Sequence, residues 1–338
     1  MKHSLLVAAL LSGSCGSSSA SVDASATIDT APACTGGVQT VADPVDAPYG
    51  MALSATDVYW TTAVLDGAKT VTKSPRTTAA PQIVASTALD IGAVVTDRAG
   101  QPYWIEAAAS DVGGGTIKTS NNGVVTTLFT VAPGAWLDSF GIAVDDTAVY
   151  WLIHNTDTFV DQVFAGAKNG TGQPRSLGTM ALPFATNVRR AQAATDGYYW
   201  GYGSGNILRV PLNGGATTTV VNEADGIGDF TVADTGIYYI VRDTGGSVKR
   251  VTPTPTPPQT LAANIGARFA IAVQGTTIAV STSDNRILTL PIAGGPPTLV
   301  TATGVTTAGA LALDGDYLFW GNTATRTAGG AVRRACIP

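Results

Sequence analysis

The chain contains few of the side chains that usually carry out acid–base, nucleophilic or metal chemistry. Its 338 residues include two histidines, two glutamates and three cysteines. Zinc sites need three or four ligands drawn from Cys, His and carboxylates, and no cluster with such spacing occurs. Because His3 lies at the extreme N-terminus, a Ser-His-Asp triad could form only at His154, and there is no Gly-x-Ser-x-Gly motif. The sequence therefore offers no recognisable catalytic motif.

Basic side chains are scarce and scattered. The formal net charge is -5, only 13% of the residues are charged, and no run of lysines or arginines occurs. Proteins that bind nucleic acids concentrate lysine and arginine on one surface, where these side chains neutralise phosphates. The composition thus excludes a nucleic-acid partner.

Long apolar stretches are missing as well. The apolar run at residues 5–11 is too short to cross a bilayer, but with the preceding Lys2 it is typical of a signal peptide spanning residues 1–20. Two processing routes remain open. Ser-Ser-Ala at 18–20 resembles a signal-peptidase site, whereas Leu-Ser-Gly-Ser-Cys at 11–15 resembles a bacterial lipobox in which Cys15 would be lipidated.

The segment that follows, residues 16–33, is rich in Ser, Ala, Thr and Asp. Such small and polar residues cannot build a core, so we interpret it as a flexible tether to a single domain over residues 34–338. We expect an exported protein, either a lipoprotein of the outer membrane or cell surface, or a secreted one. Contact with a membrane would then occur only through the lipid anchor.

A sequence repeat that occurs seven times indicates the fold. Each copy has a run of small apolar residues, a polar turn and a β-rich pair, at intervals of about 40 to 50 residues, the length of one four-stranded sheet. The pairs are Tyr59-Trp60, Tyr103-Trp104, Tyr150-Trp151, Tyr199-Trp200, Tyr238-Tyr239, Ile278-Ala279 and Phe319-Trp320. We therefore predict an all-β, seven-bladed β-propeller of four-stranded antiparallel blades. Since adjacent side chains of a strand point to opposite faces, each pair should fill the spaces on both sides of its blade.

The repeats also resemble known propeller families. Tyr59-Trp60-Thr61-Thr62 is similar to the Tyr-Trp-Thr-Asp signature of one family, and the segment 140–145 with Val149-Tyr150-Trp151 resembles the repeat of NHL-type propellers. These families are often six-bladed, whereas seven copies are counted here, and the signature Asp is Thr62. The resemblance implies a propeller fold over about residues 37–337 and carries no catalytic residue across.

The two ends of the repeat region predict how the ring closes. The seventh repeat lacks an outer strand, and residues 37–42 resemble one, so we expect them to pair with residues 331–335. This pairing would bring Cys34 close to Cys336, and an exported protein can keep a disulfide there. Cys15 is then the odd cysteine, for which lipidation would account.

Most aspartates fall in the turns between first and second strands, where their side chains can bond the turn backbone. Another set precedes the inner strands, which in many propellers line the mouth of the central channel: Tyr49, Asp90, Asp138, Arg190, Asp229 and Arg268. These residues could hold a polar ligand or Ca²⁺, or could be surface charges without a ligand. Two further candidates are Trp136, expected in a loop entering the third blade, and residues 152–161, expected to be an irregular insertion after the second strand of that blade and containing His154.

We expect a monomeric, non-catalytic binding or scaffold protein of the cell envelope that recognises a protein partner or a glycan, without a required cofactor. The alternative is a Ca²⁺-dependent hydrolase, lactonase or lyase that uses the channel mouth, which rests on analogy with other propellers. A third possibility is a structural spacer at the cell surface.

Overall fold

The computed structural model describes residues 37–62, 68–109, 112–155, 158–181, 188–252, 257–315, 317–322 and 330–337. The chain divides into residues 1–34 and a compact unit over residues 35–338, and the description concerns the second. The predicted signal peptide, tether, Cys15 and Cys34 lie outside the described residues. None of the described segments forms a helix that is long and apolar enough to cross a membrane.

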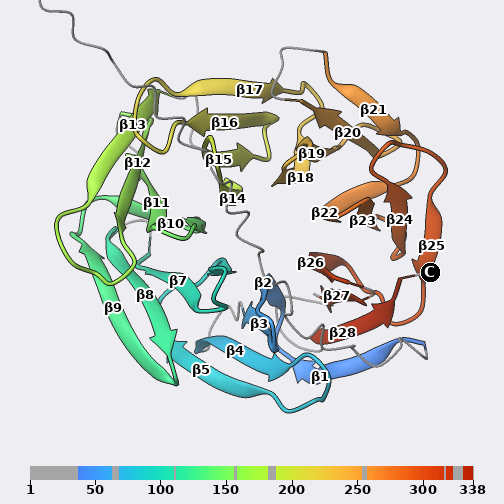
Figure 1. Ribbon diagram of the computed structural model, residues 1–338, viewed down its shortest axis with the longest axis horizontal. Helices are drawn as coiled ribbons and strands as arrows, with labels where there is room; N and C mark the ends of the chain where they lie inside the picture. The colour runs from blue at the N-terminus through green and yellow to red at the C-terminus, as the bar shows by residue number, and fades with distance from the viewer. Residues whose placement is uncertain are drawn as a thin grey trace, which may run out of the picture. The chain divides into compact units, whose positions relative to one another are not determined.

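The compact unit is a seven-bladed β-propeller, as predicted (Figure 1). Every blade is a four-stranded antiparallel sheet, and six blades use strands that follow one another in the chain. Blades 1 to 3 consist of β2 (Pro48–Leu53), β3 (Asp57–Thr62), β4 (Lys69–Pro75) and β5 (Gln82–Thr87); β6 (Val94–Thr96), β7 (Pro102–Ala107), β8 (Gly115–Asn121) and β9 (Val124–Val131); and β10 (Trp136–Val144), β11 (Ala148–Asn155), β12 (Val160–Ala167) and β13 (Arg175–Ala181).

Blades 4 to 6 have the same order from the ring axis outward. They consist of β14 (Val188–Ala194), β15 (Gly197–Tyr202), β16 (Asn206–Val210) and β17 (Thr218–Asn222); β18 (Ile227–Ala233), β19 (Gly236–Val241), β20 (Ser247–Val251) and β21 (Gln259–Ala262); and β22 (Ala267–Gln274), β23 (Thr277–Thr282), β24 (Ile287–Pro291) and β25 (Thr298–Thr301). The first strand of each blade is the inner one, nearest the ring axis.

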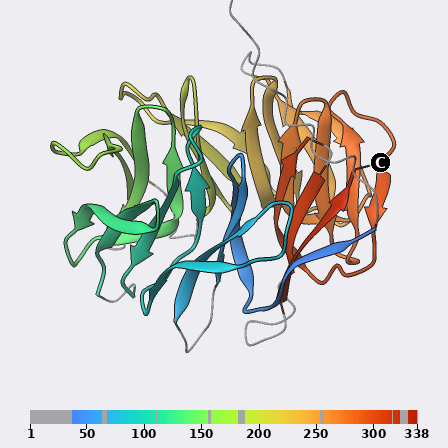
Figure 2. The same cartoon turned by 60° about the horizontal axis from the view of Figure 1, so that its bottom comes forward.

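The seventh blade is built from both ends of the chain. It contains β26 (Ala308–Asp314), β27 (Tyr317–Asn322), β28 (Gly330–Cys336) and, as its outer strand, β1 (Gln39–Val45). In the ladder between β1 and β28, Gln39 pairs with Arg334 and Ala42 pairs with Val332. Figures 1 and 2 show the first strand beside the last. The predicted closure is confirmed, because only the N-terminal strand covers the open edge of β28.

The recurring pairs form the core between the blades. In each copy the two neighbouring residues belong to different hydrophobic clusters, as their alternation along a strand requires. Tyr59 packs with Trp104, for example, whereas Trp60 packs with Phe319 on the other side of the blade. All members of the seven pairs are buried. They are therefore occupied in packing and cannot stack on a ligand.

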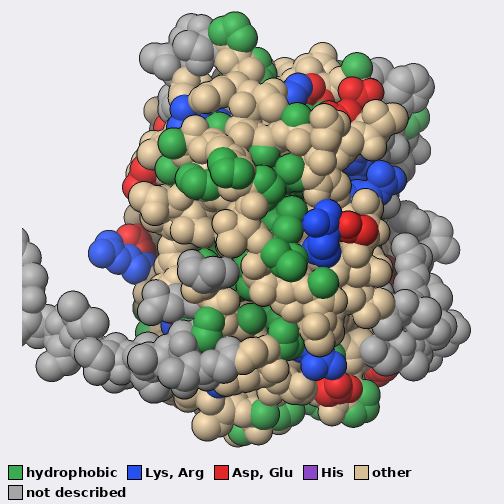
Figure 3. All heavy atoms as spheres, turned by 90° about the vertical axis from the view of Figure 1, so that its right-hand side faces the viewer, with side chains coloured by type: hydrophobic (Ala, Val, Ile, Leu, Met, Phe, Trp, Pro, Cys, Tyr) green, Lys and Arg blue, Asp and Glu red, His purple; other side chains and the backbone are tan. Residues whose placement is uncertain are grey.

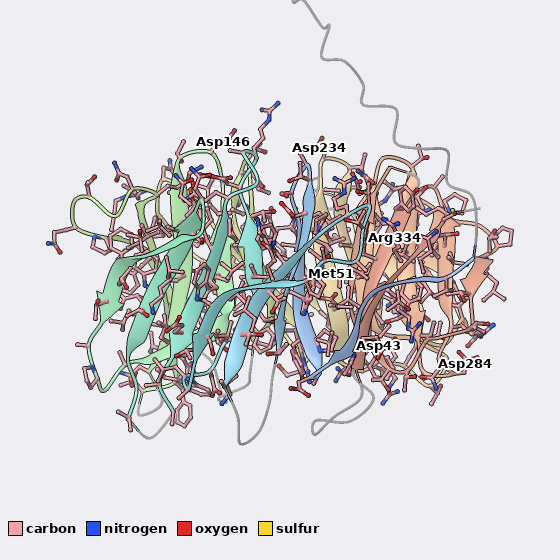
Figure 4. All side chains as sticks on the ribbon, turned by 90° about the horizontal axis from the view of Figure 1, so that it is seen from below. Asp43, Met51, Asp146, Asp234, Asp284 and Arg334 are labelled. Carbon is pink, nitrogen blue, oxygen red and sulfur yellow. The ribbon has the colours of Figure 1, made fainter. Side chains whose placement is uncertain are left out.

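Turn aspartates play the structural role expected of them. Asp145 accepts hydrogen bonds from the backbone N–H groups of Thr147 and Ala148 at 2.7 and 2.8 Å. Figure 4 places Asp146 and Asp234, both in turns between first and second strands, at one face of the ring. Asp43 and Asp284 lie at the opposite face, where the inner strands begin. On the side seen in Figure 3, charged side chains form small separate groups, so charge is not concentrated on that wall.

Two expectations about the third blade were wrong. Trp136 is the first residue of β10, where it pairs with His154, and is not in a loop. The supposed insertion at residues 152–161 belongs largely to β11 and β12, which pair continuously from Ala148–Ala167 to Asn155–Val160. Period-two alternation is hard to recognise where a strand contains polar residues, and tertiary pairing extends both strands beyond the apolar pattern.

Candidate functional site: the mouth of the central channel

A cavity of about 720 Å³ lies at the ring axis. All seven inner strands, or the residues that directly precede them, contribute to its wall: β2, β6, β10, β14, β18, β22 and β26. Arg242, which directly follows β19, lines it as well. Its volume lies within the roughly 300–1,000 Å³ typical of small-ligand sites. We call its end at the start of the inner strands the mouth.

An irregularity in the inner strands sets the shape of the mouth. In six blades the inner strand carries extra residues relative to its partner, and this bulge starts after the first pair of the ladder or, in blade 3, after the second. Bulges of this kind redirect side chains and backbone groups away from the ladder. The first residue of the bulge is Tyr49, Asp138, Arg189, Gly228, Arg268 and Gly309 in blades 1, 3, 4, 5, 6 and 7.

Buried side chains bind the bulges of neighbouring blades to one another. The Thr61 hydroxyl accepts a hydrogen bond from Gly50 N–H at 2.9 Å and donates one to the Gly92 carbonyl of the next blade at 2.8 Å. Ser281 does the same between Ala270 N–H, at 3.0 Å, and the Ala308 carbonyl, at 2.8 Å. Buried backbone N–H and C=O groups need hydrogen-bond partners. Thr61 and Ser281 provide such partners for backbone groups that the bulges remove from the ladder.

Asp138 has this structural role as well, although it was predicted to bind a ligand. Its carboxylate accepts hydrogen bonds from the N–H groups of Phe140, at 2.8 Å, and Val188 of the next blade, at 3.4 Å. The side chain is buried within the protein and does not line the cavity. Burial raises the pKa of Asp138 to about 6, against the backbone hydrogen bonds, which lower it.

Asp229 and Arg190 form a pair inside the channel. Their side chains are 3.3 Å apart, and Asp229 also accepts a hydrogen bond from Ile271 N–H of the next blade at 3.0 Å. Burial raises the pKa of Asp229, while the Arg190 charge opposes this rise. Arg190 further donates to the carbonyls of Phe230 and Ile271 at 2.9 and 3.1 Å. Both residues line the cavity as predicted, but their partners are within the protein.

The remaining members of the predicted set are dispersed. Asp90 is exposed, pairs with Lys69 at 3.3 Å and is absent from the cavity wall. Tyr49 lines the cavity, and its ring lies 5.4 Å from that of Phe140, which lines it too. Arg268 is exposed at the mouth, in the bulge of β22.

The three aspartates of the predicted set therefore do not converge on one point. Asp90 binds a lysine, Asp138 binds backbone N–H groups and Asp229 binds an arginine. Within the described ranges no group of three or more His, Cys, Asp or Glu side chains could hold a metal ion. The carboxylates of the mouth thus offer no assembled Ca²⁺ ligand set, which needs six to eight oxygens.

His154 is part of a buried cluster in the third blade. Its Nδ1 lies 2.6 Å from Asp161 Oδ1, its ring meets the Trp136 ring edge-on at 5.3 Å, and Trp200 donates to Asp161 at 3.1 Å. The buried Nε2 has no hydrogen-bond partner in the described part of the chain, so no described hydroxyl completes a triad. Trp136 thus packs on this cluster and is not part of the cavity wall.

Two residues of the mouth were missed by sequence reasoning, Arg189 and Arg242. The tandem Arg189-Arg190 is visible in the sequence, but only the bulge of β14 shows that both side chains serve the mouth. Arg242 follows the second strand of blade 5, where no pattern distinguishes it from other loop residues.

No model of a protein family matches the chain, and neither does the sequence of any curated protein. Solved structures do resemble it in fold. Oligogalacturonate lyase from Vibrio parahaemolyticus superposes with a TM-score of 0.64 at 8% identity, over 89% of this chain and 93% of that one.

Two further structures match with a TM-score of 0.50. BamB from Moraxella catarrhalis is 16% identical over 85% of this chain and 83% of its own. TolB from Acinetobacter baumannii is 10% identical over 82% of this chain and 64% of its own. At these identities the likeness concerns the propeller fold alone, and the resemblance to particular repeat families gains no support.

Proposed function

We propose that the protein is a non-catalytic binding protein of the cell envelope that receives part of a protein partner or a glycan in the mouth of its central channel. The observation that carries this proposal is the cavity of about 720 Å³, to which all seven blades contribute. The wall combines Arg189, Arg190 and Arg242 with the Tyr49–Phe140 ring pair. A few polar groups on a rigid, partly apolar wall are typical of binding sites.

The polar groups in the mouth favour binding over catalysis. Asp138 and Asp229, which have raised pKa values, are held by backbone N–H groups of the next blade, and Asp229 also by Arg190. A general acid or base has to reach its substrate with a free hydrogen-bonding position. These carboxylates instead join the inner strands and keep the mouth rigid.

Location in the envelope is part of the same proposal. It rests on the signal-like residues 1–20, on Cys15 in its lipobox-like context and on the polar residues 16–33. A disulfide between Cys34 and Cys336 would suit an oxidising compartment. Mass spectrometry of the mature N-terminus would identify a lipidated Cys15, and cleavage after Ala20 would instead indicate a secreted protein.

The test is a capture experiment with the full-length protein against solubilised envelope fractions and a glycan array. Gly309→Trp would fill the mouth, because the equivalent position carries Tyr49, Arg189 or Arg268 in other blades. Val124→Trp on the exposed side of β9 is the matched control. We expect a partner that the control retains and Gly309→Trp loses. A partner retained equally by both variants, or no partner in either assay, would contradict the proposal.

A further inference from the structure

Positive charge is concentrated at one side of the mouth. Arg189 and Arg190 come from β14 of blade 4, Arg242 follows β19 of blade 5, and Arg268 comes from β22 of blade 6. Blade 5 lies between the other two, so the four side chains belong to adjacent blades. This accumulation stands out in a protein whose formal net charge is -5.

Among the described residues, Arg190 is the one of the four arginines that forms an ion pair. Arg190 binds Asp229 and two carbonyl groups. Arg189, Arg242 and Arg268, which we call the arginine cluster, form no ion pair with any carboxylate of the described segments, and their guanidinium groups donate no hydrogen bond there. The Nε of Arg242 is buried without a partner among these residues.

Glycines leave space around the cluster. A Cβ on Gly203 would lie 2.8 Å from Arg189 Nε, and a Cβ on Gly228 would lie 2.3 Å from the Arg268 carbonyl oxygen. The first distance is within blade 4 and involves the end of the flexible Arg189 side chain, whereas the second shows that the backbones of blades 5 and 6 approach closely because Gly228 has no side chain. Arg189 and Arg242 line the cavity, and Arg268, which is outside its wall, is close enough for its charge to act on Arg242.

The charges of the cluster repel one another. Burial lowers the pKa of the Arg242 guanidinium, and the charges of Arg189 and Arg268 lower it further. A like charge nearby disfavours the charged form of a group, and an opposite charge favours it. Asp229 supplies part of that opposite charge, since the charges of Arg190 and Arg189 both oppose the rise in its pKa, and an anionic ligand would offset the remainder.

The wall also carries groups that suit a sugar ring. Tyr49 and Phe140 present a pair of aromatic rings, and Thr231 and Gln192 line the cavity as well. The Gln192 amide, however, is already bound to the Val232 backbone at 2.7 and 2.9 Å. Aromatic faces pack against apolar surfaces, and arginine forks bind carboxylates and phosphates with two parallel hydrogen bonds.

We propose that the arginine cluster binds the anionic group of an acidic saccharide, with the sugar rings extending into the channel. The inference rests on the proposed function, since it assigns a ligand class to the same mouth. A carboxylate of a uronic acid and a phosphate ester of a sugar share the required chemistry. Neutral saccharides lack the group that would offset the three charges.

Calorimetric titration of the full-length protein with trigalacturonate, glucose 6-phosphate and neutral maltotriose tests the inference. We expect binding of one or both anionic sugars, weakened by added salt, and no binding of maltotriose. Arg189→Gln, Arg242→Gln and Arg268→Gln should each weaken binding about 10- to 100-fold, as expected for loss of a charge-assisted hydrogen bond. Arg250→Gln, in which the changed side chain lies on β20 and binds Gln259, is the matched control and should bind as the unaltered protein does.

The outcomes separate this inference from the proposed function. Absence of binding by both anionic sugars, equal binding of maltotriose, or unchanged affinity in the three variants would overturn the saccharide site. If the saccharide site were overturned but Gly309→Trp still failed to capture the partner that the control variant retains, the proposed binding function of the mouth would stand. Thermal unfolding of each variant shows whether the fold is kept, and Arg189 and Arg268 are exposed enough to be replaced without changing the core.

Discussion

The buried carboxyl group of Asp138 should make the stability of the ring depend on pH in a way that one substitution removes. Its pKa is about 6 in the folded protein, compared with 3.8 for the unperturbed group. Between these values the folded state holds a proton that the unfolded chain has lost. Stability therefore decreases as the pH rises through this window.

The size of the effect follows from the shift. About two pKa units correspond to about 3 kcal/mol of unfolding free energy, fully lost once the pH exceeds the folded pKa. In Asp138→Asn the side chain is neutral at every pH, and its amide oxygen can still accept the hydrogen bond from Phe140 N–H. Relative to the unaltered protein, the variant should gain about 3 kcal/mol between about pH 4 and pH 6 and nothing more above it.

Urea unfolding followed by tryptophan fluorescence over about pH 4 to pH 8 measures this difference. Asp229, whose pKa burial also raises, is present in both proteins and so contributes equally. Asp146→Asn, at an exposed turn, controls for the loss of one negative charge. A difference between Asp138→Asn and the unaltered protein that stays constant across the window, or that decreases with pH, would refute the assigned cause.

Three further predictions concern the framework of the ring. Trp200→Ala should lower the unfolding free energy by about 3–5 kcal/mol, because the indole is fully buried between blades, and calorimetry measures this loss. Thr61→Val should cost about 1–3 kcal/mol in urea unfolding, since it leaves Gly50 N–H without an acceptor. A Cys34–Cys336 bond should appear in non-reducing mass spectrometry, and its removal in Cys336→Ser should lower stability by at most about 4–5 kcal/mol.

Each of these predictions has its own control. Val124→Ala at an exposed position of β9 should change stability little, so an equal loss there would contradict the account of Trp200. Thr56→Val, at an exposed turn, serves the same purpose for Thr61. Two free thiols in the mature protein would rule out the predicted disulfide.

Much of the fold could be predicted because its cause is local and repeated. The aromatic pairs recur in the sequence, and Tyr59 and Trp60 lie on opposite faces of β3 as simple alternation requires. The missing outer strand of the last repeat likewise showed that residues 37–42 would complete the ring, as the pairing of β1 with β28 confirms. These conclusions needed only the period of the repeat and a count of strands.

The candidate site was less predictable, because position before an inner strand does not determine what a side chain meets. Asp138 and Asp229 bind backbone groups of the neighbouring blade, and Asp90 binds a lysine outside the channel. Arg242 also lines the cavity, but it directly follows β19, a second strand, so a search of the residues before inner strands does not find it.

The sequence by itself determined the number of blades, their aromatic cores and the closure by the N-terminal strand, since these depend on alternation and repetition along one chain. Only the tertiary structure decided which charged side chains form ion pairs or hydrogen bonds within the protein and which remain available to a ligand. Bulges in the inner strands and the close approach of Gly228 to Arg268 set those contacts. Contacts of this kind join residues of different blades, and their geometry is defined only when the ring is assembled.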